Sequence, residues 1–165
     1  MFFFAMCSNF VKAPKVENIV AHKLEDILFP STFKIKNIIN KVVPTKKSYL
    51  WLRKGKSLAL LMDQKLNEGL SIDFLGRPAY TASFIADIAI RMNLDIVPIK
   101  FSRDINNHNI ITFYKKINMP KNNLSKNKKI SFILKQVNDV MSQWIKDQPE
   151  NWLWIHRRWE KDLYV

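Results

Sequence analysis

The fold is decided at residues 57–62, where the sequence reads SLALLM. An uninterrupted apolar run of this length is typical of a β-strand that is buried on both faces, and Lys-Gly-Lys before it and Asp-Gln after it mark its ends. A second short apolar run lies at residues 2–5. Both runs are typical of parallel core strands, which predicts an α/β protein.

After the strand at residues 57–62, the apolar residues recur with the spacing of a helix. Apolar residues recur at i, i+1, i+4, i+5 and i+8 from Phe84, which is the stripe of an amphipathic helix. A longer stripe over residues 133–145 predicts a second helix that ends before Pro149. A short helix is also expected at residues 49–54, where Gly55 ends it.

Two further strands are predicted between the helices. Residues 96–101 and 110–114 are rich in β-branched and aromatic side chains, and the polar turn at residues 103–109 separates them as in a hairpin. Because proline has no amide hydrogen, Pro98 is expected at a strand end or on an edge strand. Residues 120–129 are expected to form a solvated basic loop.

Length and composition place limits on the domain organisation. A chain of 165 residues is expected to be one domain, and the single Cys7 permits no internal disulfide. No Cys/His cluster has the spacing of a zinc site, so we do not expect a structural metal. The apolar start MFFFAM is far below the roughly 20 residues that cross a bilayer, and it lacks the basic start of a signal peptide. Because the chain begins inside an expected core strand, residues 1–165 are expected to be one partial domain, truncated at the N-terminus.

The charge balance indicates an anionic partner. The 27 Lys and Arg residues against 14 Asp and Glu residues give a formal net charge of +13. Phospholipid, lipid phosphate, nucleic acid and acidic protein all fit this sign, and so does a surface whose lysines only contact water.

Two short constellations carry candidate functional residues. Asp63 and Gln64 follow the strand at 57–62, where ligands of open α/β sheets gather, so Asp63 can orient a catalytic group and Gln64 can bind a ligand. Asp63 can equally cap the next turn. In a second segment, Gly76 allows a turn or a close backbone approach and Arg77 can meet a phosphate or a carboxylate. A turn that leads into the next helix needs no function.

A third constellation, WLWIHRRW, occupies residues 152–159. Interleaved Trp and Arg side chains can stack on bases, line a membrane interface or pack with their polar tips in water. Three tryptophans so close together favour packing.

Taken in order, four segments resemble a known family. They are residues 55–64, residues 73–79 (DFLGRPA) with Thr81, residues 96–98, and residues 149–159. In this order they are similar to the late acyltransferases of lipid A biosynthesis, and the resemblance covers residues 55–160.

The resemblance implies a fold and an activity. The fold would be a glycerolphosphate-acyltransferase-like mixed sheet flanked by helices. The activity would be transfer of a fatty acyl group from acyl carrier protein to a hydroxyl of a lipid A precursor, without a metal or cofactor, by a peripheral protein on the cytoplasmic face of the bacterial inner membrane. The positions with implied substrate-binding roles are Asp63, Gln64, Gly76, Arg77, His156, Arg157 and Arg158.

The catalytic signature of that family is a His followed five residues later by an acidic residue. The His takes the proton of the attacking hydroxyl, and the carboxylate orients the imidazole and stabilises its charged form. The corresponding positions in this chain are Met6 and Val11, neither of which can accept a proton. We therefore expect the chain to be inactive by itself, unless a separately encoded N-terminal piece supplies the dyad.

Other groups are weaker candidates for this chemistry. His22 is followed by Glu25 and Asp26 at helical spacing, but local pairs of this kind are mostly structural. Cys7 lacks an identifiable partner base. Two further function classes remain open: a non-catalytic protein that binds anionic lipid or a membrane surface, and, ranked last and not expected, a nucleic-acid-binding protein.

Overall fold

A computed structural model describes residues 2–7, 18–20, 46–55, 57–63, 69–106, 108–152 and 158–160. Its elements are, in chain order, β1 (Phe2–Cys7), β2 (Asn18–Val20), α2 (Lys46–Arg53), β3 (Leu58–Leu61), β4 (Leu70–Phe74), β5 (Arg77–Thr81), α3 (Phe84–Met92), β6 (Asp95–Arg103), β7 (Asn109–Phe113), α4 (Lys126–Asp147) and the 3-10 turn η2 (Pro149–Asn151). The protein is therefore α/β, as the sequence predicts.

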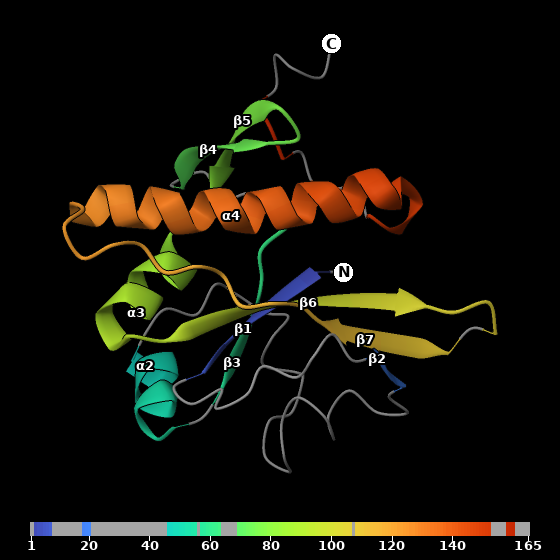
Figure 1. Cartoon of the computed structure of the whole chain (residues 1–165), viewed down its shortest axis with the longest axis horizontal. Coiled ribbons are helices and arrows are strands. Elements are labelled where there is room, and N and C mark those ends of the chain that lie inside the picture. The colour runs from blue at the N-terminus through green and yellow to red at the C-terminus, as the bar shows by residue number, and fades with distance from the viewer. Residues whose placement is uncertain are drawn as a thin grey trace.

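A five-stranded sheet with the order β2-β7-β6-β1-β3 forms the base of the molecule (Figure 1). All its described pairings are antiparallel, so the prediction that the runs at 2–5 and 57–62 are parallel strands is wrong. Leu58 and Ala59 point to opposite faces of the sheet, and both are buried. Because an antiparallel strand covered on both faces is as apolar as a parallel one, the sequence pattern alone does not separate the two cases.

The predicted hairpin is confirmed as β6 and β7, but the prediction for Pro98 is wrong. Pro98 lies within β6, an interior strand between β7 and β1. Its carbonyl accepts a hydrogen bond from the amide of Tyr114 at 2.9 Å, on the side away from β1. In an extended strand the nitrogen and the carbonyl of one residue point to the same side, so the Pro98 nitrogen also points away from β1. It lies just beyond Ile99 and Phe113, which form the last pair of the β6–β7 ladder. The missing amide hydrogen therefore interrupts neither ladder.

Three predicted helices are confirmed. Helix α2 ends before Gly55, which has a φ of 72°, and α3 covers the stripe that starts at Phe84. Helix α4 stops before Pro149 and begins at Lys126, so the loop expected at 120–129 is shorter than predicted. The first turn of α4 is lysine-rich and has no apolar periodicity, and this hid its start in the sequence.

Helix α4 is the centre of the molecule. It lies between the five-stranded sheet and a separate two-stranded hairpin, β4–β5 (Figure 1). Its buried side chains are Ile130, Ile133, Leu134, Val137, Asn138, Met141, Trp144 and Ile145. All of them except Asn138 join one hydrophobic core with side chains from α2, α3, β3, β6 and the β4–β5 hairpin. The sequence did not predict the hairpin as strands, because much of it is exposed and polar.

Candidate functional site

The strand β1 holds Met6 inside the sheet. Met6 lies opposite Leu58 of β3 on one side and opposite Ile96 of β6 on the other. Neighbouring strands on both sides fix the backbone of this position. Val11 and His22 lie outside the described residues.

The sheet end beyond Met6 meets the segment that follows β7. Cys7 lies opposite Asp95, and the Asp95 carboxylate forms an ion pair with Lys116 at 3.0 Å. The amide of Ile117 donates a hydrogen bond of 2.8 Å to the carbonyl of Ile96, the register partner of Met6. The chain around Lys116 therefore lies beside Met6, one strand away.

Asp63 lies at the opposite end of the sheet from Met6. It is half-buried and follows Met62, whose side chain is buried at the end of β3. Since β3 runs antiparallel to β1 and Leu58 is the partner of Met6, Asp63 is displaced from Met6 by about 16 Å along the strand. The structure does not bring these two predicted positions together, and Gln64 lies outside the described residues.

Gly76 and Arg77 belong to the tip of the β4–β5 hairpin. Leu75 and Gly76 have φ angles of 55° and 80°, so both central residues of this two-residue turn are left-handed. A Cβ added at Gly76 would meet no atom within 4 Å, which means that the glycine serves the turn conformation and not a close approach. Arg77 follows at the start of β5 and is exposed.

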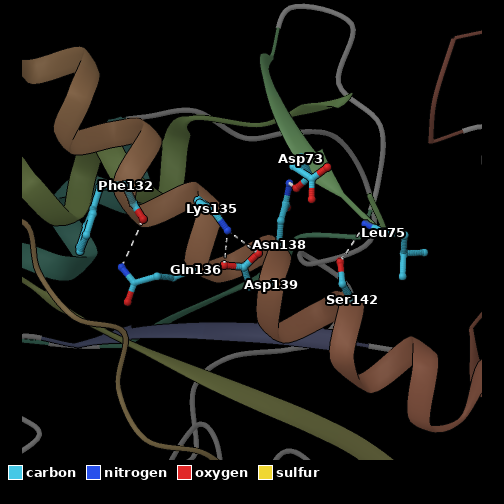
Figure 2. A network of polar contacts seen from close by, with 8 residues as sticks. All are labelled: Asp73, Leu75, Phe132, Lys135, Gln136, Asn138, Asp139 and Ser142. Atoms are coloured by element: carbon cyan, nitrogen blue, oxygen red, sulfur yellow. Dashed lines mark hydrogen bonds and ion pairs between the residues drawn. The ribbon is translucent and has the colours of Figure 1, made fainter. Parts of the chain in front are cut away.

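Helix α4 binds this hairpin through polar side chains (Figure 2). Asn138, which is fully buried, donates from Nδ2 to the carbonyl of Asp73 at 2.9 Å and to the Thr81 hydroxyl at 3.0 Å. One turn later, the Ser142 hydroxyl accepts a 3.0 Å hydrogen bond from the amide of Leu75. Neither Asn138 nor Ser142 was predicted from the sequence, although a polar residue on the buried stripe of a helix is a usable signal.

Arg158 completes this arrangement from the C-terminal segment. Its side chain is fully buried and donates to the carbonyl of Tyr80 and, at 2.9 Å, to the Thr81 hydroxyl. The guanidinium also lies over the ring of Phe74, 5.0 Å from its centroid. In the described structure this cation therefore holds the β4–β5 hairpin. His156 and Arg157 lie outside the described residues.

Two of the four segments, residues 73–81 and 149–159, thus meet around the hairpin and α4, and the resemblance is matched by a family model. The model for the bacterial lipid A biosynthesis acyltransferases matches residues 34–161. The chain belongs to this family. Met6 and Val11 precede the matched residues, so their equivalence to the catalytic dyad rests on the local sequence. No curated protein matches the chain at a significant level.

The tryptophans of the C-terminal segment of this family member pack against the hairpin. Trp152 is buried, with its ring centroid 5.7 Å from Phe74 in an edge-on contact. Trp159 lies 5.7 Å from Phe74 and 6.1 Å from Trp152, and its indole nitrogen donates to the carbonyl of Phe74 at 3.4 Å. The prediction that the tryptophans of this tail pack is confirmed for Trp152 and Trp159.

Two tyrosines of the described part have raised pKa values. The hydrogen bond that the Tyr80 hydroxyl donates to the Glu160 carboxylate, together with the negative charge of Glu160, raises the pKa of Tyr80 above its usual 10.0, while burial raises the pKa of Tyr114. Among the described residues no three His, Cys, Asp or Glu side chains gather to form a metal site. In the same part of the chain, no helix has both the length and the apolar character needed to cross a bilayer.

Proposed function

We propose that this protein is a lipid A acyltransferase homologue that does not transfer acyl groups as the single chain. In the reaction that the family resemblance implies, a hydroxyl of a lipid A precursor attacks the acyl carbon of an acyl carrier protein thioester. The new ester bond forms as the carrier thiol leaves. The observation that carries the proposal is the pair Met6 and Val11 at the dyad positions.

The chemistry explains why these two residues matter. The acceptor hydroxyl must lose its proton as it attacks the thioester, and a positioned base contributes typically about 100- to 10,000-fold to such a step. A thioether and an isopropyl group have no basic atom of the required strength. The pairing of Met6 with strands on both sides supports a dyad position with a fixed backbone, since such a position is a precondition for orienting a base.

The substrate-binding positions of this proposal differ in what supports them. Arg77 is the described cation best suited to meet a phosphate of the lipid A precursor, because it is exposed at the end of a turn with a defined conformation. Arg158 acts through the hairpin that carries Gly76 and Arg77. Asp63, Gln64, His156 and Arg157 stay in the proposal only through the family resemblance. We place the protein at the cytoplasmic face of the bacterial inner membrane on the family resemblance and its positive charge.

The test is acyl transfer from labelled acyl carrier protein to a lipid A precursor. The chain as it stands is compared with a Met6→His, Val11→Glu double variant, and Met6→Leu, Val11→Ile serves as the apolar control. We expect transfer by the double variant alone. Turnover by the unmodified chain would show that it is a working enzyme and overturn the proposal. Silence of the double variant would show that the dyad is not the only lesion.

A second function, binding to an anionic membrane surface without catalysis, is favoured by the net charge of +13. Co-sedimentation with vesicles that contain phosphatidylglycerol, compared with vesicles of phosphatidylcholine alone, tests it. Equal binding to both vesicle types, or none to either, would exclude this function.

A further inference from the structure

The chain after the β6–β7 turn is rich in lysine and contains no acidic residue. From residue 105 to residue 138 there is neither Asp nor Glu. The lysines between residues 115 and 135 are Lys115, Lys116, Lys121, Lys126, Lys128, Lys129 and Lys135. We call the surface formed by these lysines and Phe132 the lysine surface. The formal charge of the whole chain is therefore unevenly distributed, with a concentration in this segment.

Backbone and side-chain hydrogen bonds fix the lysine surface in place. Gln136 of α4 accepts a hydrogen bond from the amide of Asn118 at 3.1 Å, and it donates to the carbonyl of the same residue at 3.0 Å. The loop before α4 is thus bound to the helix, and Ile117 is bound to β6. A positive surface with a fixed backbone presents its charges in one arrangement, which favours specific recognition.

Part of the positive charge is not neutralised within the described structure. Lys116, Lys126 and Lys135 form ion pairs with Asp95, Asp87 and Asp139 at 3.0, 2.7 and 2.8 Å. The described residues provide no ion pair for Lys115, Lys121, Lys128 and Lys129.

The start of α4 is electrostatically unfavourable in the isolated protein. Its first turn contains no acidic residue, while Lys126, Lys128 and Lys129 lie beside the positive end of the helix dipole. Phe132, which is 43% exposed, lies four residues after Lys128 and three before Lys135, on the same helical face. An aromatic side chain surrounded by cations is typical of a protein–protein interface with an acidic partner.

The lysine surface also lies at the sheet end that holds the dyad position. Lys116 pairs with Asp95, the register partner of Cys7, and Ile117 binds Ile96, the register partner of Met6. A donor that docks here would bring its thioester to this end of the sheet. A bilayer or a nucleic acid would also be attracted by the charge, but neither accounts for this adjacency.

We propose that the lysine surface docks an acidic carrier protein, the acyl donor of the reaction described above. The inference rests on the proposed function for the identity of the donor, and it assigns the residues that bind it. Lys121, Lys128 and Lys129 attract the acidic face of the carrier, and Phe132 packs at the centre of the contact. The acyl thioester then points toward the sheet end at Met6 and Cys7.

The test is the affinity of the full chain for fluorescently labelled acyl carrier protein, measured by anisotropy at low salt. The docking variant is Lys128→Glu, Lys129→Glu. The control, Arg103→Glu with Lys146→Glu, makes the same change in net charge at the far end of β6 and in the last turn of α4. We expect the Kd of the docking variant to rise about tenfold or more and that of the control to change by less than about twofold. Because glutamate is favourable at a helix N-terminus, the docking variant should fold at least as well as the unmodified chain.

Three results would overturn the proposal. The first is that the unmodified chain does not bind the carrier. The second is that both double variants weaken carrier binding equally. The third is that the docking variant loses binding to phosphatidylglycerol vesicles or to an oligonucleotide but keeps its binding to the carrier. The docking and the proposed function fail separately. Carrier binding that depends on these lysines supports docking even where the Met6→His, Val11→Glu variant is silent. The opposite outcome is also possible: the Met6→His, Val11→Glu variant transfers acyl groups, and adding Lys128→Glu, Lys129→Glu to it leaves its KM for the carrier unchanged. That result would retain the proposed function and exclude the docking surface.

Discussion

Replacing Asn138 by alanine tests whether buried polar contacts hold the β4–β5 hairpin on α4. The substitution removes the two hydrogen bonds that Asn138 Nδ2 donates, at 2.9 Å to Asp73 and at 3.0 Å to Thr81. A hydrogen bond contributes a net of about 1 kcal/mol, so the free energy of unfolding should fall by about 2 kcal/mol. For a domain of this size that corresponds to a decrease in Tm of about 4–8 °C.

The measurement is thermal and urea unfolding followed by circular dichroism and tryptophan fluorescence. Trp152 and Trp159 both contact Phe74 of the hairpin, so fluorescence reports on the loosened region directly. The control is Lys135→Ala on the same helix, which removes an exposed ion pair with Asp139 and should cost less than about 0.5 kcal/mol. If Asn138→Ala unfolds together with the unmodified chain, the hairpin is held by apolar packing alone and the reasoning is refuted.

Three further predictions concern single positions. Gly69→Ala should lower the free energy of unfolding, measured in urea, by about 1–3 kcal/mol, because the added Cβ would lie 2.5 Å from the carbonyl oxygen of Thr81. An unchanged urea midpoint would show that the backbone moves freely there. Gly76→Ala should cost about 1 kcal/mol in the same measurement, from its φ of 80° alone, since nothing lies within 4 Å; a larger loss would reveal a contact at the turn. The hydrogen bond that the His108 side chain donates lowers the pKa of Asp104 below its usual 3.8. The ionised Asp104 therefore stabilises the fold fully above pH 3.8, and this stabilisation is lost as the pH falls through the lower pKa of the folded state. Urea unfolding between about pH 2 and 5 should therefore show a shallower acid loss for Asp104→Asn, and an identical slope would contradict this.

The sequence predicted those elements whose apolar pattern has one clear period. Helix α3, most of α4 and the β6–β7 hairpin carry such a period over their lengths. It could not predict strand direction, because an uninterrupted apolar run in the sequence fits an antiparallel core strand as well as a parallel one. It also missed β4 and β5, since the hairpin covers α4 with few buried side chains.

The candidate site was predictable as residue types and not as an arrangement. The turn function of Gly76 could be inferred from its flanking residues, and the packing of the tryptophans from their density. The position of Arg158 could not be inferred, because an arginine in a basic tail is normally exposed and here it is fully buried. The distance between Asp63 and Met6 likewise follows from strand direction, which the sequence left undetermined.

The contacts of the family segments bear on how activity is inferred for this chain. Phe74, Thr81, Trp152, Arg158 and Trp159 contact one another or the same hairpin, together with Asn138 of α4. Each of these contacts stabilises the folded chain whether or not acyl transfer occurs. Their presence is therefore evidence for the fold, and it is equally expected in an active and an inactive member. Under the proposal above, the difference between the two lies at Met6 and Val11, and the Met6→His, Val11→Glu comparison tests this because it leaves the scaffold unchanged and alters only the chemistry.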